Sequence, residues 1–176
     1  MPAPRPTRIR VVRRPGEATR GLLFVGGQAF PCALGRAGIT RFKREGDGAT
    51  PAARMTLLAG QWRADRIARP AAALPLARIH PTDGWSDDCA DGRYNRPVRL
   101  PFAGSHEIMR RDDHLYDIVV VLDWNVSRRA LHRGSAIFFH LAHADWRPTA
   151  GCVAVAAADM RRILARLGRR AVMTVE

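Results

Sequence analysis

The sequence predicts a mainly β fold with a helix near the C-terminal end, and three observations support this. Gly26-Gly27 separates two apolar runs and is a strong signal for a tight β-hairpin. Residues 118–122 form an uninterrupted apolar run of strand length, typical of a strand buried on both faces. Residues 156–167 instead carry apolar side chains at helical spacing, namely Met160, Ile163, Leu164 and Leu167.

In chain order, a proline-rich tail at residues 1–7 is expected to be disordered, and residues 8–176 to form one domain. Strands are expected at residues 8–12, 21–25, 29–34, 54–63, 118–122, 135–139 and 171–175. Eight Gly and Pro residues punctuate residues 64–104, which favours irregular connections there over several full elements. Long irregular segments often form functional rims, so we expect polar and aromatic side chains here to line a groove. The candidates are Trp85, Asp87, Asp88, Asp91, Tyr94 and Asn95.

The net charge of +13 comes mainly from arginine, and Lys43 is the only lysine. The arginines are scattered, without the interleaved aromatic side chains of a nucleic-acid-binding face, so we expect no nucleic-acid partner. A codon bias toward Arg and Ala explains the charge more simply. Attraction to a polyanionic surface, such as an acidic wall polymer or anionic lipid, stays open.

The three cysteines form no CxxC pair, and their separations do not match structural zinc modules. An odd count leaves at least one thiol outside any intramolecular disulfide. A bridge between Cys32 and Cys89 is one alternative, although Cys32 lies in a strand context that favours a small buried hydrophobic residue. Cys152 is the thiol expected to be free.

No segment reaches the roughly 18 consecutive apolar residues of a membrane span, so we expect no stable membrane insertion. The basic residues 1–14 are not followed by the apolar core of a signal peptide. This leaves two alternatives for the location, the cytoplasm or an exported protein whose signal lies outside this sequence.

The C-terminal third carries a cysteine and a histidine in an arrangement typical of a nucleophilic thiol. His140 ends an apolar run twelve positions before Cys152. Cysteine attacks as its thiolate, so it requires a histidine within hydrogen-bond reach that lowers the pKa of the thiol. We therefore expect the intervening loop to fold back and join these two side chains, with His106 and His114 as hydrogen-bonded support.

Residues 148–154 (Pro-Thr-Ala-Gly-Cys-Val-Ala), His140 before them, and residues 46–51 (Gly-Asp-Gly-Ala-Thr-Pro) together resemble the catalytic domain of the L,D-transpeptidases, the YkuD-type family. The resemblance spans nearly the whole chain and suggests a compact, divergent branch. It implies a mostly antiparallel β-sandwich or barrel-like fold with one or two short helices. It also implies an enzyme that remodels peptidoglycan stem peptides in the periplasm or cell envelope, as a monomer and without a cofactor.

Carried onto this sequence, the resemblance makes Cys152 the nucleophile that forms a thioester with the stem peptide. His140 becomes the general base and later the general acid, and the backbone N–H groups of Gly151 and Cys152 bind the oxyanion. Family members commonly place an arginine where Ala154 stands here, so Arg147 is a candidate to bind the substrate carboxylate in its place. Further candidates for substrate contact or support are Thr149, His114, His106 and Trp85.

Three alternatives remain open at this stage. If water instead of an amine accepts the acyl group from the thioester, the protein is an L,D-carboxypeptidase or endopeptidase. His140, His143 and Cys152 offer the ligand types of a catalytic zinc site, although positions i and i+3 of a strand do not share a face; we expect no metal. A non-catalytic basic module that binds wall polymer is the third alternative.

Overall fold

The computed structural model describes residues 8–176, so the expected disordered tail at residues 1–7 lies outside the described residues. Within that range the chain forms fourteen strands and one helix. Their bounds are β1 Arg8–Arg13, β2 Arg20–Val25, β3 Gln28–Ala33, β4 Ile39–Thr40, β5 Thr50–Pro51, β6 Arg54–Trp62, β7 Leu76–Arg78, β8 Asp83–Ser86, β9 Arg96–Arg99, β10 His106–Ile108, β11 Ile118–Leu122, β12 Phe138–Leu141, β13 Val153–Val155, α1 Ala157–Leu164 and β14 Val172–Val175.

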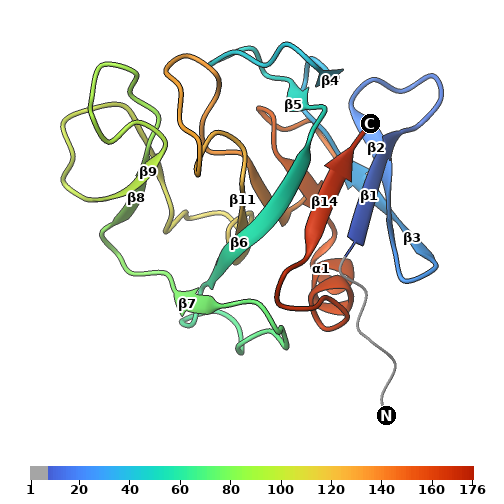
Figure 1. Cartoon of the computed structure of the whole chain (residues 1–176). Coiled ribbons are helices and arrows are strands. Elements are labelled where there is room, and N and C mark those ends of the chain that lie inside the picture. The colour runs from blue at the N-terminus through green and yellow to red at the C-terminus, as the bar shows by residue number, and fades with distance from the viewer. Residues whose placement is uncertain (1–7) are drawn as a thin grey trace.

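Eight strands form a closed barrel in the order β11-β12-β13-β3-β2-β1-β14-β6, which β6 closes by pairing with β11 (Figure 1). Two of the eight pairings, β1 with β14 and β12 with β13, are parallel, and the other six are antiparallel. The predicted mainly β, mostly antiparallel and barrel-like fold is therefore confirmed. The hairpin predicted at Gly26-Gly27 joins β2 to β3.

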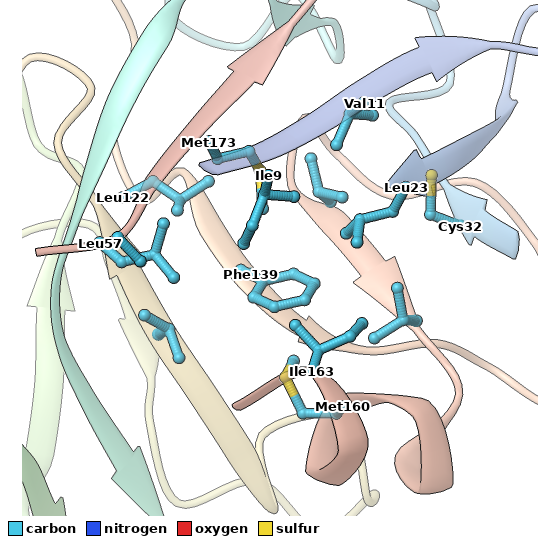
Figure 2. Close-up of a cluster of buried hydrophobic side chains, with 14 of the residues drawn as sticks. Ile9, Val11, Leu23, Cys32, Leu57, Leu122, Phe139, Met160, Ile163 and Met173 are labelled. Carbon is cyan, nitrogen blue, oxygen red and sulfur yellow. The ribbon is translucent and has the colours of Figure 1, made fainter. Parts of the chain in front are cut away.

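The barrel interior is filled by alternate side chains of its strands, and α1 covers one end (Figure 2). Met160 and Ile163 of the helix point toward Phe139 inside the barrel. The helix ends at Leu164, earlier than residue 167, because the amides of Arg166 and Leu167 turn back onto carbonyls three residues before them. The predicted apolar stripe is fully buried.

A second layer packs on the outer faces of β11 and β12. It is the three-stranded sheet β10-β8-β9, which lies at the left in Figure 1. The expectation of irregular connections through residues 64–104 is thus wrong, because β7, β8 and β9 lie within them. Pro97 is accommodated inside β9 because β9 is an edge strand. Trp85 of β8 packs edge-to-face on Phe138 of β12 with ring centroids 5.3 Å apart.

Candidate functional site

The cysteine and the histidine lie on the outer face of the barrel, under this second layer. In the parallel pairing of β12 with β13, His140 is level with Ala154, which places Cys152 two positions along the neighbouring strand on the same face. Strand spacing and rise put their Cα atoms roughly 8 Å apart, a gap that the two side chains can span. Both line a cavity of about 370 Å³.

Two backbone groups hold the thiol. Cys152 Sγ accepts a hydrogen bond from the N–H of Phe138 and donates one to the carbonyl of Ala136, each at 3.3 Å. Burial raises the pKa of the Cys152 thiol to about 12, and the N–H of Phe138 opposes this by favouring the thiolate. The resting sulfur is therefore a neutral thiol at pH 7, whereas sequence reasoning expected a thiolate.

His140 is oriented as a neutral base. Its Nδ1 lies 2.8 Å from the carbonyl of Leu141. A carbonyl only accepts, so Nδ1 carries the hydrogen and Nε2 keeps its lone pair. Burial lowers the pKa of His140 to about 4, opposed by that hydrogen bond and assisted by the charge of Arg111. The thiol hydrogen points to the Ala136 carbonyl and not to the imidazole. Hydrogen bonds between a nucleophile and its base commonly tighten only when substrate binds.

The loop before the cysteine is tied by one hydroxyl. Thr149 Oγ1 donates to the carbonyl of Cys152 at 2.7 Å and accepts from the N–H of Gly151 at 3.1 Å. Gly151 adopts a φ of +139°, and a Cβ there would lie 2.8 Å from the carbonyl oxygen of Ala49. The Gly151 amide is thus engaged, whereas the Cys152 amide makes no hydrogen bond outside the strand ladders within residues 8–176.

The Gly-Asp-Gly-Ala-Thr-Pro segment braces this loop. Asp47 accepts hydrogen bonds from the amides of Arg44 and Ala49 and pairs with buried Lys43. Thr50 Oγ1 accepts from the N–H of Gly35 and lies 3.5 Å from the carbonyl oxygen of Cys152. The segment quoted for the resemblance therefore contacts the cysteine loop directly, which its turn-forming composition alone did not indicate.

Asn95 supports the other side of the thiol. It is fully buried with a φ of +54°, and its Oδ1 accepts hydrogen bonds from the indole N–H of Trp85 at 2.9 Å and the amide of Ala136 at 3.1 Å. Its Nδ2 donates to the carbonyls of Trp124 and Asn125. All four hydrogen-bonding positions of the amide are thus used, and Ala136 is the residue whose carbonyl receives the thiol hydrogen.

Charged side chains of both signs line the cavity. Glu107 is mostly buried, which raises its pKa, and the hydroxyl of Tyr116 donates to it at 3.4 Å. The ring of Tyr116 also packs edge-to-face on the imidazole of His140, with centroids 5.3 Å apart. Sequence reasoning missed these residues because they come from distant segments. The charged lining residues are Arg36, Lys43, Glu45, Asp87, Glu107 and Arg111.

Two predicted histidines lie outside the cavity and bond to backbone. His114 Nε2 donates to the carbonyl of Ala142 at 2.9 Å, which anchors the chain just after β12. His106 Nδ1 donates to the carbonyl of Gly104 at 2.7 Å. Neither lines the cavity, so each has a supporting position.

Two further candidates also lie apart from the cavity, whereas Thr149 lines it. Trp85 lies beneath the site, where its ring supports Phe138. Arg147 is exposed and pairs with Asp145 at 3.4 Å, so the cavity does not include it. The arginines that the cavity does include are Arg36 and Arg111.

Residues 8–176 contain no group of three or more His, Cys, Asp or Glu side chains placed to hold a metal ion. The zinc alternative therefore has no ligand set among them. All three cysteines are free, so the alternative of a disulfide between Cys32 and Cys89 is wrong. Cys32 lies in the barrel core, where burial raises its pKa to about 12.

Fold and site together define a β-barrel protein with a cysteine and a neutral histidine on one cavity. Residues 10–175 match the YkuD family model, described as the L,D-transpeptidase catalytic domain, so the chain belongs to this family. Neither a curated protein nor a solved structure matched the chain in the other two comparisons. Residues 8–176 include no helix with the length and apolarity needed to cross a membrane.

Proposed function

We propose that the protein is a peptidoglycan L,D-transpeptidase in which Cys152 is the nucleophile and His140 the general base. The observation that carries the proposal is their shared cavity: both side chains face it, and the imidazole presents an unprotonated Nε2. This activity places the site of action in the cell envelope.

In the first half-reaction, His140 Nε2 takes the thiol proton as Sγ attacks the carbonyl carbon of an L,D peptide bond. The amide N–H of Cys152 stabilises the oxygen of the tetrahedral intermediate. The carbon–nitrogen bond then breaks, the imidazolium returns its proton to the departing amine, and a thioester remains on Cys152. Because imidazole and thiol are both neutral at rest, the proton moves together with the attack, and no preformed ion pair is needed.

In the second half-reaction, an acceptor amine attacks the thioester carbonyl. His140 takes a proton from the amine, the carbon–sulfur bond breaks and the thiol is regenerated with that proton. The product is a new amide cross-link. Water in place of the amine gives the hydrolytic alternative through the same thioester.

The deciding experiment is intact-mass analysis after incubation with a carbapenem and, separately, with tetrapeptide muropeptides plus an amine acceptor. We expect one covalent adduct on the wild-type protein and none on Cys152→Ala, whereas Cys32→Ala and Cys89→Ala keep it. Cross-linked product identifies transpeptidation, and trimmed peptides alone identify hydrolysis. An adduct that survives Cys152→Ala would contradict the proposal.

A further inference from the structure

A second cavity, of about 390 Å³, opens between the loop after β4 and the loop after β11. Its only acidic lining residue among residues 8–176 is Asp123, and the carboxylate of Asp123 already accepts hydrogen bonds from the amide and hydroxyl of Ser127. The basic lining residues are Arg41, Lys43, Arg54, Arg128 and Arg133. Five cations around one cavity make it a candidate anion site.

No carboxylate of residues 8–176 neutralises the charges of its four arginines. Lys43 pairs with Asp47, but none of the arginines forms an ion pair with a carboxylate of residues 8–176, and all four are exposed. Elsewhere exposed arginines do pair, as Arg10 does with Glu176. Converging guanidinium groups repel one another, and their planar donors match phosphate oxygens, so an incoming phosphate is favoured.

Exposed apolar side chains flank this cavity. Phe42 is 82% exposed and Leu131 is 54% exposed, and they are two of the three large exposed apolar side chains among residues 8–176. Their loops are joined by a hydrogen bond from the amide of Glu45 to the carbonyl of His132. Both loops project from the end of the barrel away from α1 (Figure 1). A cationic cavity between exposed apolar side chains is the chemistry of an interfacial membrane contact.

We propose that this end of the barrel docks reversibly on an anionic phospholipid bilayer. The arginine cavity binds the lipid phosphate, and Phe42 and Leu131 enter the boundary between headgroups and acyl chains. An acidic polymer would use the arginines but would leave the two apolar side chains in water, which favours lipid. The proposal does not depend on the proposed function. Lys43 lines both cavities, so docking would hold the catalytic cavity close to the membrane surface.

The test is co-sedimentation with phosphatidylglycerol-containing vesicles, and with phosphatidylcholine vesicles as reference. The test variant combines Arg41→Gln, Arg128→Gln and Arg133→Gln, whose side chains make no ion pair in residues 8–176. The matched control combines Arg161→Gln, Arg169→Gln and Arg170→Gln. It removes equal charge from exposed positions around α1 that likewise form no ion pair among the described residues. Each arginine near the membrane surface strengthens vesicle binding about fivefold. We therefore expect vesicle binding to be about a hundredfold weaker for the test variant and at most about threefold weaker for the control.

A second pair of variants separates lipid from other phosphate sources. We expect Phe42→Ser to weaken vesicle binding severalfold and Ile108→Ser, at the third exposed apolar position, to leave it unchanged. Equal losses in the two triple variants would reveal a net-charge effect and overturn the proposal. Absence of vesicle binding would also overturn the proposal. A third contrary result would be that inorganic phosphate or a soluble polyanion binds at least as tightly as the vesicles and that Phe42→Ser does not affect this binding. Melting temperatures check that every variant is folded.

Discussion

The side-chain oxygen of Asn95 accepts a hydrogen bond from the backbone N–H of Ala136 at 3.1 Å, and the carbonyl of Ala136 receives the thiol hydrogen of Cys152. One buried amide thus links the second layer of the fold to the sulfur. Ala136 has a φ of +51°, which costs a non-glycine residue about 1–2 kcal/mol. The hydrogen bond from Asn95 helps to offset that cost and fixes the direction of the carbonyl.

We expect Asn95→Gly to destabilise the protein by about 2–4 kcal/mol, because four partner groups, one buried and three partly buried, lose their hydrogen bonds. Asn95→Ala should cost about 1 kcal/mol more, since alanine at φ +54° is strained and glycine is not. Urea unfolding measures both. Carbapenem acylation of folded Asn95→Gly should be slowed, and an unchanged rate would show that Ala136 is held without Asn95.

The turn before the cysteine gives a second prediction. Gly151→Ala should destabilise the protein and abolish acylation, because the added Cβ would meet the carbonyl oxygen of Ala49 at 2.8 Å and the φ of +139° suits only glycine. Gly92→Ala is the matched control, since a Cβ there meets nothing within 4 Å. Thermal unfolding and adduct formation are measured for both. An active Gly151→Ala variant would show that the loop tolerates a shift.

The elements set by local apolar patterning were predictable. The strand expected at residues 118–122 is β11, and the helical stripe at residues 156–167 contains α1. The strands β8 and β9 were missed because Gly84 and Pro97 lie inside them. Pro97 is tolerated because β9 is an edge strand of its sheet. Periodicity over such short strands carries little information.

The candidate site was predictable only in part. The loop between His140 and Cys152 was expected to bring the two side chains together, and both line one cavity. Their resting charge was not predictable in this way. Burial by Tyr116 and the second layer favours neutral forms of both groups, and that cover depends on contacts between distant segments. Asn95, expected on a groove, is instead completely buried.

Burial of His140 predicts a specific pH dependence. Its pKa of about 4 in the folded state lies below the unfolded value near 6.5, so its contribution to stability is present above pH 6.5 and is lost as pH falls toward 4. That difference corresponds to about 3 kcal/mol in full. We expect the unfolding free energy of wild type to fall more steeply over this range than that of His140→Gln.

His143→Gln is the control for that measurement, because it removes a partly exposed histidine from the same cavity. The unfolding free energy of His143→Gln should still fall steeply between pH 6.5 and pH 4. The acid limb of kcat/KM, which reports the free enzyme's essential base, should lie near pH 4 in wild type. A limb near 6.5 would contradict a buried, neutral imidazole.

The last prediction concerns the substrate carboxylate. Ala154, at the position where family members commonly have an arginine, is buried against Ala33 and Ala142 under Trp146, which leaves no room for a long side chain. Arg36 lines the cavity of Cys152 and His140 and makes no ion pair in residues 8–176. Its Nη2 donates to the carbonyl of Gly46 at 3.3 Å, and the remaining guanidinium donors are available to a carboxylate.

We therefore expect Arg36→Gln to raise KM for tetrapeptide donors by about 10-fold or more, with a smaller effect on kcat, since a charged hydrogen bond contributes about 1.5–3 kcal/mol. Arg147→Gln should leave both constants near wild type, because Arg147 is exposed, pairs with Asp145 and lies outside the cavity. Donors whose terminal carboxylate is amidated provide the second arm. They should bind wild type and Arg36→Gln equally weakly. A persisting difference would assign carboxylate recognition to another residue, and Arg111 is the other arginine that lines the cavity.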